Sequence, residues 1–340
     1  MVLSTRDYEL FELGSVTLQS NAKLPDMKLA YKTFGTLSAA KDNVILYPTR
    51  FAGSHIENMC MFGEGRALDP ERYFIIVPSM FGNGFSSSPS NTPAPYDGPR
   101  FPGCTLLDNV LCQERLLRER FGIQEIALAI GWSMAAQNVY QWAALFPDRV
   151  RRLIPLCGSA RTAPHNFVFL EGAKRALTAD AAWAGGDYTE SPAIGLKAMS
   201  QVYAGWAFSQ AFYRGALYER LGYDSLPDFL KRYWEDSFLR RDANDMLAQI
   251  WTWQHGDISA NETFQGDFDK ALGAIPAKSF VMPCDHDLYF RVADSKIEVA
   301  RMANAELRVI RSPYGHMSAG DKDAKDSAFI DDQIRELMAS

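Results

Sequence analysis

The sequence predicts an α/β fold in which a mostly parallel central sheet is covered by helices on both faces. Short apolar segments rich in β-branched residues recur along the chain, and helical patterns separate them. These segments lack the polar alternation of a half-exposed strand, which is typical of parallel strands buried on both faces. The expected strands span residues 44–48, 73–79, 126–131, 153–158, 279–284 and 306–310.

The beginning and the middle of the chain depart from this alternation of strands and helices. Segments 16–20 and 28–35 alternate polar and apolar residues, which predicts an antiparallel entry to the sheet. Between the fourth and fifth expected strands, helical patterns span 167–180, 194–222, 226–241 and 243–257. We therefore predict a core of residues 1–162 and 276–340, and a helical insertion of residues 163–275 that would roof a pocket.

Composition narrows the class of protein. The 340 residues include 35 basic and 41 acidic ones, for a net charge of −6, which argues against nucleic acid or an anionic membrane as the main partner. No segment approaches the roughly 18 consecutive apolar residues of a membrane span. Segment 1–16 carries charges where a secretory signal needs an apolar stretch. Five cysteines without a C-x-x-C pair suit free thiols, so we expect a cytoplasmic protein.

Two short groups of metal-ligand types occur in the sequence. They are His255 with Asp257, and Asp285, His286 and Asp287. Such spacings are common by chance, and no cysteine pairs support a zinc cluster. We expect no metal site and no cofactor.

The segment Gly131-Trp132-Ser133-Met134-Ala135 follows an expected buried strand and opens an expected helix. A tight turn that happens to use small residues would explain it without function. A G-x-S-x-G elbow instead lifts a serine clear of the sheet, and its neighbours two positions away must be small. Gly131 and Ala135 both meet that requirement, and alanine in place of the second glycine is a mild departure from the motif. We predict Ser133 as a nucleophile.

A serine nucleophile needs a base and a third group that orients the base. If the chain order is serine, acid, histidine, the base follows the last strand. His316 lies there in a Pro/Gly-rich loop, although a surface histidine would fit the same loop. Asp285 and Asp287 follow the strand at 279–284, and both could reach the base. The apolar residues after Asp287 indicate that its side chain points inward, so we prefer it.

The oxyanion formed on attack needs two preorganised N–H donors. Met134 supplies one at the start of its helix. The loop after 44–48 should supply the other, with Phe51 as the candidate and Gly53 giving the loop freedom to turn. We expect the substrate pocket to include Arg50, Trp132, Ser200, Tyr203 and Trp206.

With these residues identified, the chain resembles the homoserine O-acetyltransferases of the α/β-hydrolase superfamily. The resemblance implies the α/β-hydrolase fold, a triad of Ser133, Asp287 and His316, Phe51 as an oxyanion donor, and a helical lid often used for homodimer contacts. The family's H-A-L-T-G loop corresponds to T-R-F-A-G at 49–53 in this chain. The other matching segments are D-x-x-R-Y-F at 69–74, the elbow at 131–136, lid segments at 183–196 and 242–249, and acid and base segments at 287–290 and 312–316.

The departures from that family concern the substrate. The family's lid has an alanine–arginine pair, and the arginine is thought to hold the substrate carboxylate. In this chain the two positions are occupied by Met199 and Ser200. Met246 replaces a lid tyrosine, and Ala135 and Ala136 replace elbow glycines. A hydroxyl cannot replace a bidentate guanidinium–carboxylate contact. The sequence therefore predicts a pocket less charged than a homoserine site.

The predicted enzyme forms an acyl-Ser133 intermediate from a small-molecule substrate. We expect a hydrolase of an apolar ester, thioester or amide, because the carboxylate anchor is lost and the insertion is rich in aromatic residues and Met. The alternative is an acyltransferase that uses acyl-CoA as co-substrate and a non-homoserine alcohol or amine as acceptor; kinship and a water-excluding lid favour it. A binding module without activity is disfavoured, because serine, acid and histidine are all present in chain order.

Overall fold

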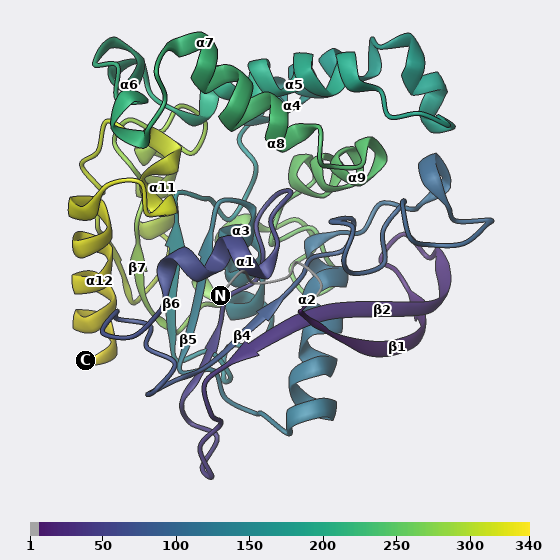
Figure 1. Cartoon of the computed structure of the whole chain (residues 1–340). Coiled ribbons are helices and arrows are strands. Elements are labelled where there is room, and N and C mark those ends of the chain that lie inside the picture. Colours follow the sequence, from purple (N-terminus) through teal and green to yellow (C-terminus); the bar gives the residue numbers. More distant parts are fainter. Residues whose placement is uncertain (1–6) are drawn as a thin grey trace.

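The computed structural model describes residues 7–340 and contains an eight-stranded sheet in the spatial order β1-β2-β4-β3-β5-β6-β7-β8 (Figure 1). The predicted lack of an export signal depends partly on residues 1–6, which lie outside the described residues. The strands are β1 (Glu9–Thr17), β2 (Lys23–Phe34), β3 (Val44–Leu46), β4 (Phe74–Pro78), β5 (Leu128–Trp132), β6 (Arg152–Leu156), β7 (Lys278–Val281) and β8 (Ala305–Leu307).

The predicted sheet architecture is confirmed. β1 pairs with β2 and β2 with β4 in antiparallel fashion, and the other neighbours are parallel. β7 and β8 are shorter than expected because pairing beyond Val281 and Leu307 is reduced to single bridges, Leu156 with Met282 and Cys284 with Ile310. The loops that follow can therefore turn into the carboxyl edge of the sheet.

Both faces of the central strands β3, β4 and β5 are buried, which explains the missing polar alternation in these segments of the sequence. Ile45, Ile75 and Ile130 enter one apolar cluster, and their neighbours Val44 and Ile76 enter the other. Helix α12 (Ala324–Met338) adds residues to the first cluster, and α2 (Leu106–Arg115) and α3 (Met134–Leu145) to the second. Short α1 (His55–Asn58) and α11 (Val292–Val299) complete the core helices.

The helical insertion lies between β6 and β7 and forms the upper layer in Figure 1, above the sheet. The expected helix over 194–222 breaks at Ser209, whose side chain caps a new helix by accepting from the N–H of Phe212. The proposed domain limits at 163 and 275 stay a prediction. The α-helices of the insertion are α4 (Pro164–Thr178), α5 (Ala193–Ala207), α6 (Gln210–Arg214), α7 (Leu226–Phe229), α8 (Asp236–Phe238), α9 (Ala243–Gln254) and α10 (Phe268–Gly273).

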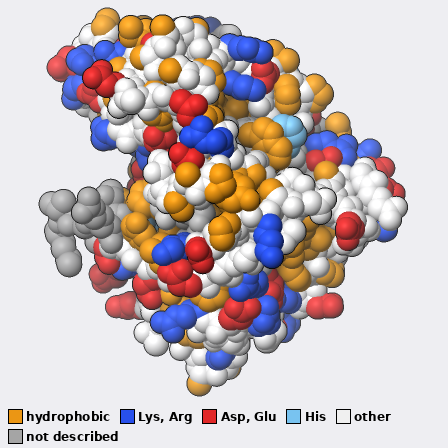
Figure 2. Space-filling model, turned by 90° about the vertical axis from the view of Figure 1, so that its right-hand side faces the viewer, with side chains coloured by type: hydrophobic (Ala, Val, Ile, Leu, Met, Phe, Trp, Pro, Cys, Tyr) orange, Lys and Arg blue, Asp and Glu red, His pale blue; other side chains and the backbone are white. Residues whose placement is uncertain are grey.

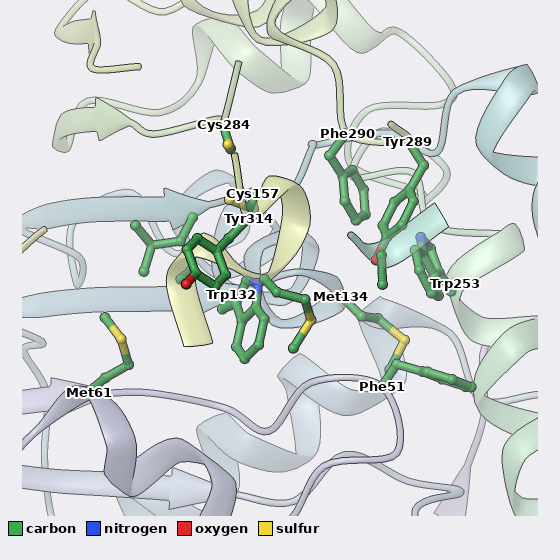
Figure 3. Packing of buried hydrophobic residues seen from close by; sticks show 14 of the residues in the cluster. Phe51, Met61, Trp132, Met134, Cys157, Trp253, Cys284, Tyr289, Phe290 and Tyr314 are labelled. Atoms are coloured by element: carbon green, nitrogen blue, oxygen red, sulfur yellow. The ribbon is translucent and has the colours of Figure 1, made fainter. Parts of the chain in front are cut away.

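Aromatic side chains join the insertion to the core. Tyr203 of α5 stacks on Phe51 of the loop after β3, with ring centroids 5.5 Å apart. Trp253 of α9 lies 5.7 Å from Phe51 and stacks on Phe290 at 5.6 Å, an arrangement visible in Figure 3. Phe169 of α4 packs against both Tyr203 and Trp253. The aromatic stripe therefore packs the insertion onto the loops at the sheet edge.

Two searches of residues 7–340 gave negative results. No helix there has the length and apolarity that crossing a bilayer requires. No three or more His, Cys, Asp or Glu side chains in that range are grouped so that they could hold a metal ion.

A carboxyl group is buried where α11 meets the core. Glu298 is 3% exposed, and its two oxygens accept hydrogen bonds from the Tyr140 hydroxyl at 3.0 Å and the Ala160 N–H at 2.7 Å. Burial raises the pKa of Glu298 to about 8 despite these two donors.

Glu298→Gln should remove a pH-dependent loss of stability. The folded state holds the Glu298 proton up to about pH 8, whereas the unfolded chain loses it near the ordinary value of 4.5. The free energy of unfolding of the parent should therefore fall between these pH values by roughly 3–5 kcal/mol from this group. Urea unfolding from pH 5 to 8.5 measures this. The variant should lack that slope, the exposed control Glu306→Gln should retain it, and parallel curves for all three would contradict the expectation.

Candidate active site

Ser133 occupies a strained turn between β5 and α3. Its backbone has φ 63° and ψ −129°, in a region that L-residues rarely adopt. Its N–H donates to the carbonyl of Leu156 at 2.9 Å, which ties the turn to β6. A Cβ on Gly131 would lie 2.3 Å from the carbonyl oxygen of Ala135, so a side chain there is excluded. This is the geometry of a nucleophile elbow.

His316 and Asp287 form a buried pair at the carboxyl edge of the sheet. The His316 Nδ1 lies 2.8 Å from the Asp287 Oδ2, and the two residues are 3% and 0% exposed. The other carboxylate oxygen of Asp287 accepts from the N–H groups of Tyr289 and Phe290, both at 3.0 Å. The carboxylate is thus fixed in orientation, and it orients the imidazole in turn.

Asp285, the alternative acid, faces other partners. It accepts from the Nδ1 of His286 at 2.7 Å and from the N–H of Ser312 at 3.2 Å. Arg311 lies 3.6 Å from its second oxygen. The structure brings Asp287, and not Asp285, to His316.

A cavity of about 360 Å³ lies above the elbow, and Ser133 and His316 both line it. The expected pocket residues Arg50, Trp132 and Tyr203 line it as well, and so does Phe51, the expected oxyanion donor. Trp132 also donates from its indole N–H to the carbonyl of His316 at 3.1 Å, which joins the elbow to the base loop.

Two expected pocket residues lie away from the cavity wall, so that part of the prediction is wrong. Ser200 is 0% exposed and donates to the carbonyl of Lys197 in its own helix. Trp206 packs against His165 and Phe169. Both are on α5, where the helical period turns Tyr203 toward the cavity and these two residues elsewhere.

The loop 49–53 contains Phe51, the predicted oxyanion donor. Within the described chain, neither the N–H of Phe51 nor that of Met134 donates to a protein acceptor, whereas the N–H of Ala52 donates to the Gln249 Oε1 at 2.6 Å. Figure 3 shows Phe51 and Met134 near one another. Gln249 belongs to α9, and its contact fixes a loop residue with a φ of 50°. Sequence reasoning missed Gln249, because no local motif signals a contact across 197 positions.

The cavity carries several charged side chains, although serine stands at the position of the family's carboxylate-binding arginine. Five cations line the cavity against a single carboxylate, that of Glu57. The structural cause is that several segments each contribute a basic side chain, which linear spacing does not reveal. Acidic and basic side chains are by contrast interspersed over the face of the molecule in Figure 2. The five cations are Arg50, Arg232, Arg240, Arg241 and Lys322.

Two of these cations have carboxylate partners. Arg241 binds Glu57 at 3.0 Å, and Arg232 pairs with Asp228 in its own helical segment. Burial raises the pKa of Glu57, but Arg50, Ser54 and Arg241 outweigh burial and hold it below its ordinary value. Burial lowers the pKa of Arg241, although Glu57 opposes that shift. Glu57 is therefore an anion that Arg241 binds directly and that the charge of Arg50 also stabilises.

Comparison with known proteins now decides the family. The family described as alpha/beta hydrolase fold matches residues 42–323. The chain belongs to that family. This hydrolase is 39% identical to the ethyl acetate hydrolase of Pseudomonas veronii, over 98% of its own length and 96% of that relative.

The predicted resemblance to homoserine O-acetyltransferases is confirmed, although at lower identity. The enzyme of that name from Chlorobaculum parvum is 31% identical, over 88% of this chain and 86% of the relative. The crystal structure of an acetylester hydrolase from Corynebacterium glutamicum superimposes with a TM-score of 0.96 at 37% identity, over 99% and 97% of the two chains. The two relatives named as hydrolases, which have the higher identities, support the predicted serine hydrolase over the acyltransferase alternative.

Gly131→Ala should destabilise the protein by about 1–3 kcal/mol, because its Cβ would overlap the Ala135 carbonyl oxygen in a packed turn. Gly172→Ala is the matched control, since it lies in α4 with no atom within 4 Å of the added methyl group, and it should be neutral or stabilising. Thermal unfolding measures both. Equal effects of the two changes would contradict the elbow packing described above.

Asp287→Asn should lower kcat by about 10⁴-fold, because an amide favours the wrong tautomer of His316 while preserving the packing. Asp285→Asn should cost less than about tenfold, because its partners lie outside the buried pair. Ester hydrolysis at saturating substrate measures both rates. A larger loss from Asp285→Asn would reassign the acid.

Proposed function

We propose that this protein is an esterase that hydrolyses acetyl and similarly short acyl esters through an acyl-Ser133 intermediate. The observation that carries the proposal is the shared cavity of Ser133 and His316, with His316 bound to the buried Asp287. The P. veronii and C. glutamicum relatives, named for ethyl acetate and acetyl esters, support the acyl class. They favour an ester over the thioester or amide that the sequence also allowed.

The proposed reaction uses only groups of this chain and water. His316 Nε2 accepts the proton of the Ser133 hydroxyl as the serine oxygen bonds to the ester carbonyl carbon. The N–H groups of Phe51 and Met134 stabilise the resulting oxyanion. The bond to the alcohol oxygen then breaks, and His316 donates its proton to that oxygen. A water molecule then attacks the acyl carbon while His316 accepts its proton. The bond between the acyl group and Ser133 breaks, His316 returns the proton to the serine oxygen, and the acid is released.

Three further features belong to the proposal. The helical insertion acts as a lid, which its cavity-lining residues Tyr203, Phe238 and Met246 support. Five free cysteines suit a cytoplasmic location, and the kinship with acetyltransferases favours a homodimer formed through the insertion.

Ser133→Ala should abolish both ester hydrolysis and labelling by a fluorophosphonate probe, because the attacking hydroxyl is removed while the fold is kept. Release of p-nitrophenol from p-nitrophenyl acetate and mass spectrometry of the labelled peptide measure these effects. Ser191→Ala, in an exposed position before α5, is the control and should retain full activity. Labelling of another residue in the parent would refute the proposal.

The acyltransferase alternative has a direct test, because water and an acceptor compete for the same acyl-serine. Acetyl-CoA should be consumed no faster when alcohols or amino acids are added. Turnover of acetyl-CoA only in the presence of an acceptor would replace hydrolysis by transfer while leaving Ser133 as the nucleophile.

A further inference from the structure

Three cations of the active-site cavity have no carboxylate partner in residues 7–340. They are Arg50, Arg240 and Lys322, here called the cation cluster, and they come from three separate parts of the chain. Arg50 lies in the loop after β3, Arg240 follows α8 in the insertion, and Lys322 follows the short helical turn that holds His316. Core and insertion thus direct positive charge into one cavity of a protein whose net charge is −6.

Arg50 lies beside the nucleophile. Its guanidinium carbon is 4.7 Å from the ring centroid of Trp132, the residue before Ser133. It donates one side-chain hydrogen bond, to the carbonyl of Phe51 at 3.2 Å, and its Nε is buried without a partner. Glu57 acts on this guanidinium only from beyond salt-bridge distance. A half-buried guanidinium with an unused donor is costly, because it has lost hydration without full compensation.

Lys322 and Arg240 complete the cluster, and both line the same cavity as Arg50. The Lys322 Nζ lies 5.4 Å from the ring centroid of Tyr233. Burial lowers the pKa of Lys322, and the charge of Arg50 adds to that shift while Cys60 and Asp321 oppose it. Arg240 is exposed and adjoins Arg241 in sequence. Glu57 interacts with Arg50 but also binds Arg241 at 3.0 Å, so one carboxylate faces more than one cation.

A neutral ester would gain little from this arrangement. An anion among the three cations would restore the electrostatic compensation that burial removes, and it would orient the ester relative to Ser133. Guanidinium and ammonium groups both bind carboxylates well. The sequence indicated that a carboxylate contact is lost at the Ser200 position. Other residues of the cavity can supply such a contact.

We infer that the preferred substrate of this esterase is an ester that carries a carboxylate, held by Arg50 and Lys322 beside Ser133. The inference rests on the proposed esterase function and names its substrate class. The carboxylate belongs either to the alcohol part or to the acyl part of the ester. The two sources share the same recognition chemistry, and the choice of substrates separates them.

Two matched substrate pairs test the inference. 4-Acetoxybenzoate and 4-acetoxybenzamide differ by a carboxylate on the alcohol part, and monoethyl succinate and ethyl succinamate differ by a carboxylate on the acyl part. Within each pair the shapes are nearly equal. The measured quantity is the ratio of kcat/KM for the carboxylate to kcat/KM for the amide, with p-nitrophenyl acetate as a neutral reporter of esterase activity.

The parent should favour the carboxylate by at least about tenfold in one pair, the scale of a hydrogen bond to a charged group. Arg50→Gln and Lys322→Gln should each lower that ratio by about tenfold, and Arg50→Lys and Lys322→Arg should restore part of it. Arg175→Gln, with its side chain 79% exposed on α4, is the matched control and should keep the parent ratio. Raising the salt concentration should also reduce the ratio.

The possible failures are distinguishable. If the parent shows no preference in either pair but hydrolyses p-nitrophenyl acetate through Ser133, the inference is overturned and the esterase proposal stands. If the Arg50 and Lys322 variants slow both members of a pair equally, their role is structural and the inference is again overturned. If no ester is hydrolysed by the parent, the proposed function itself fails.

Discussion

The site depends on the backbone of Ser133 being held at a positive φ between β5 and α3. A residue in such a region costs of order 1–3 kcal/mol, which the surrounding structure must supply. The bond from the Ser133 N–H to Leu156 and the start of α3 hold the turn. Space is equally constrained, since a Cβ on Gly131 or Gly158 would lie 2.3 Å from its nearest neighbour. The parallel strands β5 and β6 thus fix the serine, and the cavity forms around it.

The helical insertion contacts the loop of residues 49–53, which lines the active-site cavity. Gln249 of α9 holds the loop whose Phe51 N–H is the proposed oxyanion donor, and Arg241 binds Glu57 beside that loop. Tyr203 stacks on the Phe51 ring. A displacement of the insertion would therefore disturb the loop of residues 49–53, so the position of the insertion and the geometry of this loop are linked.

Charge is distributed unevenly in this hydrolase. The chain as a whole is acidic, yet its active-site cavity is lined by five cations and one carboxylate. Basic residues in a cavity interact more strongly than the same residues on an open surface, because water screens them less. The loss of one arginine at the Ser200 position therefore says little about the field in the cavity, which Arg50, Arg240 and Lys322 set together.

The sequence by itself determined the sheet, the order of its parallel strands in the chain and the position of the elbow. Burial patterns along a strand and the small residues around a tight turn are local constraints, and they are visible in linear order. The preference for Asp287 over Asp285 also came from local context, and the geometry of the pair with His316 agrees with it.

Only the tertiary structure decided which distant side chains meet. Ser200 and Trp206 turned away from the cavity because the rotation of α5 is fixed by packing, which presents Tyr203 instead. Gln249 reaches Ala52 across 197 positions, and the cation cluster joins three segments that share no motif. Such contacts depend on how helices dock on a sheet, and that docking minimises the energy of the whole core. No short stretch of sequence encodes it.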